Sequence, residues 1–355
     1  MSEQKIKVLI VDDSALVRQS LKRVFAQDTS IEVIGAASDP YFAARIIARD
    51  VPDVITLDLQ MPRMNGLTFL QKIMSQRPIP VVVISSLAKE NSDIAIKALD
   101  YGAIDVIEKP IMRTSEFFQT SSYKIIEAIK AAAIANIKII KNNRLQHNDK
   151  LNIKSQYQDY GHTTIAKPAN RIVLMGASAG GTEVVANILS QLPENCPPVV
   201  IVQHMPEQFT LAFSRRLDNM SRIKVKEAEM GDCLEYGNAY VAPGNSHVIL
   251  KRKGLQFFIE TTQQSLFNRH RPSVDVLFNS AAEHDGKFFL GIILSGMGRD
   301  GVDGLVKLKN NNALTIAQNR ESCIVFGMPK EAIQADAVAK TLSPEKIVKE
   351  IVMFK

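Results

Sequence analysis

The chain of 355 residues has no tryptophan and only three cysteines, and these scarcities narrow its class. Cys196, Cys233 and Cys323 lie far apart and form no CxxC pair, which argues against a disulfide framework and against a zinc site. No apolar run approaches the roughly 18 residues of a membrane-spanning helix, and no small-residue cleavage site follows the N-terminal run. These absences predict a cytoplasmic protein that is not inserted in a membrane.

The composition indicates an ordinary globular protein with room for two domains. Hydrophobic residues make up 46% of the chain and charged residues 23%, which is typical of globular proteins, and the length suffices for about two separate cores. The net charge of +6 raises the possibility of nucleic-acid binding. Residues 111–170 hold nine basic and four acidic side chains, so nearly all of the excess lies in this segment. A solvated helix face and linker is the plainer interpretation.

The first 110 residues predict an N-terminal α/β domain. Five short apolar runs, from KVLIVDD to GAIDVIEKP, alternate with segments of helical periodicity. Such repetition of strand and helix predicts a parallel, doubly wound sheet of five strands. We expect the last helix over 115–141, so that the domain spans 1–141.

A segment without periodicity follows, and a second α/β domain is expected after it. Asn, Gln, Lys, His and Asp dominate 142–170, which predicts a flexible basic linker. Regular structure resumes at Arg171, and strand–helix alternation predicts a doubly wound α/β domain over 171–355. Within this domain, turn signals over 231–260 predict inserted antiparallel hairpins.

Three aspartates follow the ends of predicted strands in the first domain: Asp12, Asp13 and Asp58. Side chains at the carboxyl ends of parallel strands meet at the crevice where ligands bind. Clustered carboxylates repel one another unless a cation lies among them, and their hard oxygen atoms suit Mg²⁺. A plainer interpretation makes these acids N-caps of the following helices.

Two further polar groups belong to the same sheet edge. A hydroxyl group of Ser85 or Ser86 follows the fourth predicted strand, and Lys109 follows the fifth. Carboxylates, a metal ion, a hydroxyl and an ammonium group on one rim are what an acyl phosphate on an aspartate requires. The first domain is therefore predicted to accept a phosphoryl group.

In the second domain, the segment LMGASAGGTEVV predicts a strand, a tight turn and a helix. The glycines before the helix can cradle a phosphate, as in dinucleotide binding. Alternatively, the turn holds Ser178 exposed as a nucleophile where the helix dipole favours negative charge. A dinucleotide site needs an acidic residue at the end of the next strand, but the chain has His204 there. A histidine instead suits the deprotonation of a serine.

Of the six histidines, only His204 ends a predicted buried strand beside that of Ser178. We expect His247 to be structural, while His270, which lies between two arginines, could touch the substrate. The others are expected in the linker or in exposed positions: His147, His162 and His284.

The segment FFLGIILSGMGRDG ends an apolar run with an aspartate among glycines. Because Ser178, His204 and Asp300 each follow a predicted parallel strand, they can converge on one sheet edge as a Ser-His-Asp triad. Three glycines let the backbone approach closely and leave N–H groups for an oxyanion hole; they are Gly296, Gly298 and Gly301. An alternative makes Asp300 the N-cap of the helix that follows it.

The motifs VDDS, DLQMPRMNG, VVVISS and EKP, within about the first 130 residues, resemble a response-regulator receiver domain with a flavodoxin-like fold. The resemblance implies that Asp58 is the phosphoacceptor and that Asp12 and Asp13 hold Mg²⁺ with it. It also implies that Ser85 contacts the phosphoryl group and that Lys109 is its counter-ion.

The motifs GASAGG, QHMP, APGNSH, RHRPSVDVLF, SGMGRDG and SCIVFGMP occur in this order over about 171–353. Together they resemble the catalytic domain of chemotaxis protein-glutamate methylesterases. The resemblance implies that Ser178 is the nucleophile, His204 the base and Asp300 the residue that orients it. It further implies that the Met297 backbone N–H contributes to the oxyanion hole.

These resemblances imply a phosphorylation-activated enzyme of chemotaxis-type signalling. Its substrate would be a glutamate γ-methyl ester on the cytoplasmic helices of methyl-accepting chemoreceptors, with glutamate and methanol as products. It would also deamidate glutamines at similar sites. A chemotaxis histidine kinase would supply the phosphoryl group, and the receiver domain would need Mg²⁺ to accept it. The esterase reaction would need no cofactor.

Three positions depart from the usual family pattern. Val106 stands where receiver domains carry an aromatic ring, and Ala179 and Ser295 stand where the esterases carry threonine. The main alternative function is a response regulator with a nucleic-acid-binding output, and a catalytically silent adaptor is another. The second half shows no helix-turn-helix spacing, and the basic charge lies outside it, which favours the esterase.

Overall fold

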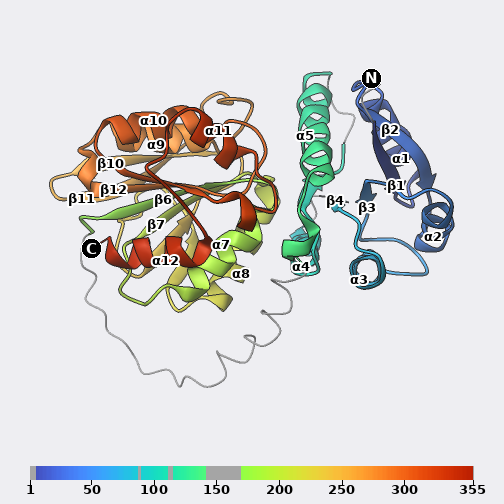
Figure 1. The fold of residues 1–355 in the computed structure, drawn as a ribbon, viewed down its shortest axis with the longest axis horizontal. Coiled ribbons are helices and arrows are strands. Elements are labelled where there is room, and N and C mark those ends of the chain that lie inside the picture. The colour runs from blue at the N-terminus through green and yellow to red at the C-terminus, as the bar shows by residue number, and fades with distance from the viewer. Residues whose placement is uncertain (1–4, 87–88, 111–114, 141–168, 355) are drawn as a thin grey trace. The chain divides into compact units, whose positions relative to one another are not determined.

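The computed structural model describes residues 5–86, 89–110, 115–140 and 169–354 (Figure 1). The chain divides into two compact units, Met1–Arg144 and Leu145–Lys355. Most of the predicted linker at 142–170 lies outside the described residues. Within the described stretches, no helix is long and apolar enough to cross a bilayer.

The first unit is built on a five-stranded parallel sheet with the order β2–β1–β3–β4–β5. Its strands are β1 (Ile6–Val11), β2 (Ile31–Ala37), β3 (Val54–Leu57), β4 (Val81–Ser85) and β5 (Asp105–Glu108). All residues of β3 and β4 are buried, as expected for a parallel sheet that helices cover on both faces. The predicted five-stranded parallel sheet is confirmed.

Helices connect these strands and bring two strand ends together. They are α1 (Ala15–Phe25), α2 (Pro40–Arg49), α3 (Gly66–Gln76), α4 (Lys89–Asp100) and α5 (Ser115–Ala133). α1 packs beside α5, and α3 packs beside α4. β1 and β3 are neighbours, and the chain turns in opposite directions along the sheet after each of them. Their carboxyl ends therefore form the crevice in which such sheets bind ligands.

The last helix of the first unit is shorter than predicted. α5 ends at Ala133, and residues 137–140 form a separate helical turn. Ile139 N donates to Asn136 O at 3.2 Å, so the new turn begins at Asn136. Asparagine favours helix N-caps over helix interiors. The prediction of a continuous helix over 115–141 is wrong at this point.

The second unit is built on a seven-stranded parallel sheet with the order β14–β13–β12–β6–β7–β9–β8. Its strands are β6 (Ile172–Ala177), β7 (Val199–Gln203), β8 (Lys224–Glu227), β9 (Asn238–Val241), β12 (Phe289–Ile293), β13 (Leu314–Gln318) and β14 (Lys340–Leu342). All residues of the central strands β12, β6 and β7 are buried. The predicted doubly wound α/β domain is confirmed.

One antiparallel hairpin is inserted, formed by β10 (His247–Lys253) and β11 (Gln256–Thr262). The predicted antiparallel hairpin insert is confirmed, while β9, in the same stretch 231–260, joins the main sheet and pairs in parallel with β7 and β8. Ala239, Tyr240 and Val241 of β9 are buried, and a place in the core sheet covers them on both faces. The hairpins predicted over 231–260 thus reduce to one among the described residues, because β9 belongs to the main sheet.

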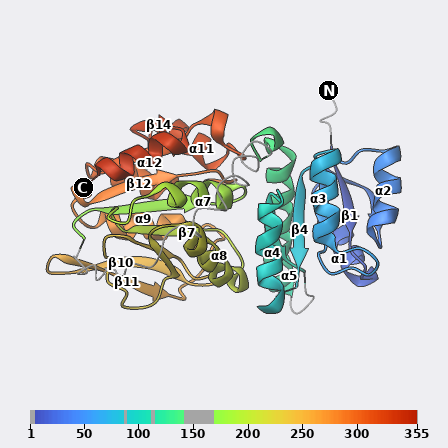
Figure 2. The ribbon, with the colours of Figure 1, turned by 90° about the horizontal axis from the view of Figure 1, so that it is seen from below.

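Helices cover both faces of the second sheet (Figures 1 and 2). One face carries α7 (Gly181–Gln191), α8 (Glu207–Met220) and α12 (Pro344–Met353), and the other carries α9 (Val274–Ala282) and α10 (Val302–Asn310). The hairpin packs on α9, and α11 (Met328–Gln334) follows β13. β12, β6 and β7 are adjacent, so the segments that follow these three strands share one edge.

Candidate active site

Ser178 lies directly after β6, in the turn that leads into α7. Gly180 is the N-cap of α7 and has a φ of 70°, a left-handed conformation that glycine adopts without strain. Ser178 N donates to Ser295 O at 3.0 Å, and Ser178 O accepts from Gly181 N at 2.8 Å and from Gln203 Nε2 at 2.9 Å. The turn that carries the hydroxyl is therefore fixed by bonds from three segments.

The loop after β12 packs closely against this serine. A Cβ atom added to Gly296 would lie 2.8 Å from Ser178 Cβ and 2.3 Å from Met328 Sδ, so only glycine allows this approach. Gly296 O accepts from Met328 N at 2.8 Å, which fixes the loop. The backbone of Met297, the next residue, is thereby held in the loop beside the nucleophile candidate.

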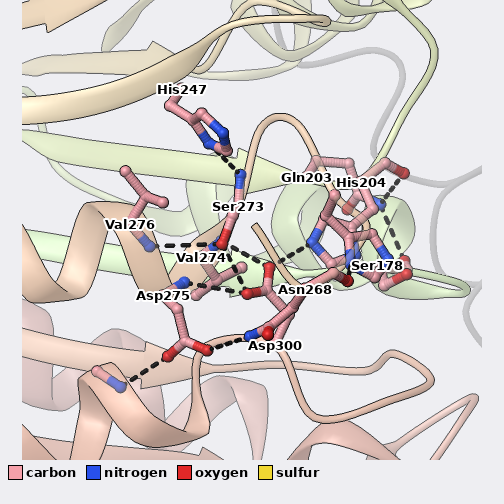
Figure 3. A network of polar contacts seen from close by, with 12 residues as sticks. Ser178, Gln203, His204, His247, Asn268, Ser273, Val274, Asp275, Val276 and Asp300 are labelled. Atoms are coloured by element: carbon pink, nitrogen blue, oxygen red, sulfur yellow. Dashed lines mark hydrogen bonds and ion pairs between the residues drawn. The ribbon is translucent and has the colours of Figure 1, made fainter. Parts of the chain in front are cut away.

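His204 directly follows β7 and pairs with Asp300. Ala177 and Gln203, the residues before Ser178 and His204, are partners in the β6–β7 register, so the two side chains start from adjacent strand ends. His204 Nε2 lies 2.8 Å from Asp300 Oδ2 (Figure 3). Nδ1 is buried and has no hydrogen-bond partner within the described part of the chain. With Nε2–H donated to the carboxylate, Nδ1 is the nitrogen that can take a proton.

Asp300 is buried at the N-terminus of α9. Its carboxylate accepts from Ser273 Oγ at 2.7 Å, from Val274 N at 2.7 Å and from Asp275 N at 3.2 Å (Figure 3). Burial alone would raise the pKa of Asp300, but its contact with His204 and the other donors lower that pKa well below its usual range. The N-cap of α10 is Gly301, without a side-chain cap, so the alternative that made Asp300 the cap of that helix is wrong.

The polar residues predicted for the first unit also come together. Asp12 follows β1, Asp58 follows β3 and Lys109 follows β5. Lys109 Nζ lies 2.9 Å from Asp12 Oδ2 and 2.8 Å from Asp58 Oδ2. Lys109 N donates to the carbonyl oxygen of the buried Ser85 at 2.9 Å. The arrangement concentrates two buried carboxylates around one ammonium group.

The donor set of this pocket fits a divalent cation. Asp12, Asp13 and Asp58 each offer a carboxylate oxygen, and these atoms lie within 4.8 Å of one another. Burial raises the pKa of Asp12, against the lowering effect of Lys109. Apart from its ion pair with Lys109, the buried Asp12 Oδ2 has no hydrogen-bond partner among the described residues. Hard oxygen ligands of this kind are those that Mg²⁺ takes.

Two of the departures from the usual pattern have defined environments. Val106 is buried in β5 opposite Val83 of β4, so no aromatic ring can rotate there. Ser295 Oγ donates to Ala179 O at 3.0 Å and accepts from Val325 N at 2.9 Å. The hydroxyl of Ser295 thus braces the turn that follows Ser178.

Comparison with known proteins decides the family. Residues 173–351 match the family model described as CheB methylesterase, and residues 8–120 match the response regulator receiver domain. The chain belongs to the CheB methylesterase family. It is an ester hydrolase joined to a receiver domain.

Curated relatives and a solved structure agree with this assignment. A protein-glutamate methylesterase/protein-glutamine glutaminase of Geobacter metallireducens is 47% identical over 98% of each chain. A relative with the same activities in its name, from Rhodopseudomonas palustris, is 48% identical over 100% of this chain and 98% of its own. The crystal structure of the Thermotoga maritima CheB methylesterase catalytic domain matches with a TM-score of 0.51 and 38% identity. It covers 52% of this chain and 98% of that one.

Two residues near His204 and Asp300 had no definite role predicted from the sequence. The His270 ring stacks on that of His204, with ring centroids 3.9 Å apart and an interplanar angle of 11°. The expectation for His270 was only that it could touch the substrate. Asp275 is buried and accepts from Gly304 N at 2.6 Å and from Asn268 Nδ2 at 2.9 Å. In the sequence, the only sign that Asp275 is buried is that an acidic residue stands within the apolar run SVDVLF.

His247 has the structural environment that was expected of it. It is buried, and its Nδ1 accepts from Ser273 N at 3.2 Å (Figure 3). Its Nε2 lies 3.1 Å from Ser265 O. Ser273 in turn donates its hydroxyl to Asp300. His247 therefore helps to position Ser273, which in turn positions the carboxylate of Asp300.

Proposed function

We propose that this enzyme hydrolyses γ-methyl esters of glutamate on methyl-accepting chemoreceptors, releasing methanol, and that it deamidates glutamines at similar sites. The family match and the activities in the relatives' names support this proposal. The observation that carries it is the 2.8 Å contact between His204 Nε2 and Asp300 Oδ2, which leaves Nδ1 for the Ser178 hydroxyl. We propose that the enzyme acts in the cytoplasm, where the receptor helices that carry these sites lie.

The triad geometry supports nucleophilic acyl transfer. Ser178 Oγ attacks the ester carbonyl while His204 Nδ1 takes the hydroxyl proton, and Asp300 stabilises the imidazolium. The Met297 N–H donates to the oxyanion of the tetrahedral intermediate. Methanol leaves with the proton from His204, and water then attacks the acyl-serine by the same route to release glutamate. Deamidation differs only in that ammonia is the leaving group.

The receiver domain supplies control. We propose that a chemotaxis histidine kinase donates a phosphoryl group to Asp58 and that this step activates the esterase. Asp12, Asp13 and Asp58 would hold Mg²⁺, which supplies neutralisation of the phosphoryl charge when it is bound. Ser85 then contacts the phosphoryl group, and Lys109 exchanges its ion pair with the Asp58 carboxylate for one with the phosphate.

Two other functions have less support. A nucleic-acid-binding output is disfavoured because residues 173–351 match a methylesterase family. A silent adaptor is disfavoured by the 2.8 Å contact between His204 Nε2 and Asp300 Oδ2, which start from the same sheet edge as Ser178. A DNA gel shift and an ester-hydrolysis assay on the same preparation separate the first of these functions from ours.

Removal of the nucleophile tests the proposal. Ser178→Ala is expected to lower methanol release from methylated receptor membranes by roughly 10⁴-fold, as deletion of a triad member does. Ser190→Ala is the matched control, because Ser190 lies on α7 and donates only to Asn187 O within its own helix. Near-normal methanol release by Ser178→Ala would refute the assignment.

A further inference from the structure

A tight turn places one side chain beside the triad that the mechanism above does not use. Phe267 N donates to His270 O at 3.1 Å, and His270 N donates to Phe267 O at 2.8 Å. The two residues between them, Asn268 and Arg269, have φ values of 49° and 65°. A positive φ at both central positions is the geometry of a type I′ hairpin turn. Phe267 and His270 are therefore a directly opposed, hydrogen-bonded pair.

The side chains of such a pair project to the same face of the turn. His270 stacks on His204 with ring centroids 3.9 Å apart, so this face is turned toward the catalytic imidazole. Phe267 occupies the same face and is 42% exposed, and its neighbour Leu266 is 44% exposed. Phe267 thus lies on the face turned toward His204 without being buried by the fold.

Neighbouring residues hold the turn in place. Asn268 Nδ2 donates to the buried Asp275 Oδ2 at 2.9 Å. Arg271 donates from Nη1 to the carbonyl oxygens of Gln263 and Gln264 at 2.9 and 2.8 Å, and from Nη2 to Asn245 Oδ1 at 2.6 Å. A surface that is fixed before binding loses little entropy when a partner docks on it.

We propose that Phe267 is a substrate-docking residue that packs on apolar side chains of the receptor helix carrying the ester. This inference rests on the proposed function. A methyl ester side chain is small, so binding energy for the reaction must come from contacts remote from the carbonyl. Exposed aromatic residues on fixed surfaces are the usual anchors of protein interfaces. The exposed Arg269 beside it suits a helix whose ester sites become carboxylates.

Kinetics with the full-length enzyme and methylated receptor membranes test the inference. Phe267→Ala is expected to raise KM about tenfold while kcat stays within about twofold of wild type, because the lost contact forms before the reaction. Phe267→Leu should recover most of the affinity. Leu255→Ala is the matched control, since Leu255 is 80% exposed at the tip of the β10–β11 hairpin, and it should change neither value.

Binding measured without turnover gives a second readout. In the Ser178→Ala background, Phe267→Ala should reduce co-sedimentation with receptor membranes about tenfold. Unchanged KM and unchanged co-sedimentation would overturn the inference. A loss in kcat alone would also overturn it, because the turn would then act only through His270 and His204. If wild type releases no methanol from these membranes, the proposed function fails instead.

Discussion

Asp300 shows how one residue can serve two neighbours. Its carboxylate lies at the N-terminus of α9, where Val274 N and Asp275 N donate to it, and it also holds His204 Nε2. Partial positive charge at a helix N-terminus stabilises a carboxylate. In the proposed mechanism, the same ionised group stabilises the imidazolium that forms during catalysis. The position on α9 thus keeps the triad acid charged despite its burial.

Asp275, one residue further along α9, is expected to make stability depend on pH. Burial raises the pKa of Asp275 to about 6, with the nearby Asp300 adding to the effect. Between about pH 4 and about pH 6 the folded state therefore holds a proton that the unfolded state has lost, so stability falls as pH rises through this window. The loss amounts to about 3 kcal/mol.

The variant Asp275→Asn isolates this contribution. Because it cannot ionise, the free energy of unfolding in urea should fall less between pH 4 and pH 7 than it does for wild type. The comparison uses the difference between the two proteins at each pH, so that other titrating groups cancel. An identical pH dependence for the two would show that Asp275 titrates in its ordinary range.

At the scale of elements, the loop after β12 is expected to tolerate no side chain at Gly296. The added methyl group of Gly296→Ala would meet Ser178 Cβ at 2.8 Å and Met328 Sδ at 2.3 Å. A displacement of the nucleophile by about 1 Å is enough to lower kcat about 10²-fold. Methanol release measures this, and thermal unfolding of the full-length chain checks that the esterase unit is folded. Wild-type kcat in this variant would mean that Ser178 is not held by the loop.

Much of both sites could be predicted from elements that obey one rule. Ser178, His204 and Asp300 each follow an apolar run, and parallel strands bring their carboxyl ends to one edge. The same rule brought Asp12, Asp58 and Lys109 together. Such a placement can be predicted because strand direction and hydrophobic pattern are local properties of the sequence.

What could not be predicted depends on contacts between distant segments. Asp300 lies at the N-terminus of α9 because its carboxylate accepts a hydrogen bond from Val274 N, 26 positions earlier in the chain. Stacking of His270 on His204 depends on a turn whose positive φ values fall on Asn268 and Arg269 rather than on glycine. β9 pairs with β7 in the folded sheet, and turn signals in the sequence do not show which strand lies beside β7. Tertiary packing decided each of these features.

At the scale of the whole molecule, phosphorylation is expected to act only through Asp58. Asp58→Asn should abolish labelling by acetyl phosphate and any stimulation of methanol release by it. Asp53→Asn is the matched control, because Asp53 is exposed and accepts from Lys7 N at 2.8 Å, away from the pocket. Equal labelling of Asp58→Asn and wild type would place the phosphorylation site elsewhere.

A fragment that begins at Lys167 separates the two ways in which the receiver domain can act. If the unphosphorylated receiver domain blocks the esterase, the fragment should be faster than the full-length chain and should not respond to acetyl phosphate. A change of about 1.4 kcal/mol in the blocking equilibrium would alter the rate up to tenfold. A fragment no faster than the full-length chain would mean that the receiver domain recruits the enzyme to its receptor.

The central claim, that Ser178 and His204 act as one catalytic unit with Asp300, is tested most directly by combining variants. Ser178→Ala and His204→Ala should each lower kcat for methyl-ester hydrolysis by roughly 10⁴-fold. The double variant should then be no more than about threefold slower than either single variant, because the loss of one member already removes most of the rate enhancement that the triad provides. A double variant whose loss equals the product of the two single losses would contradict the account.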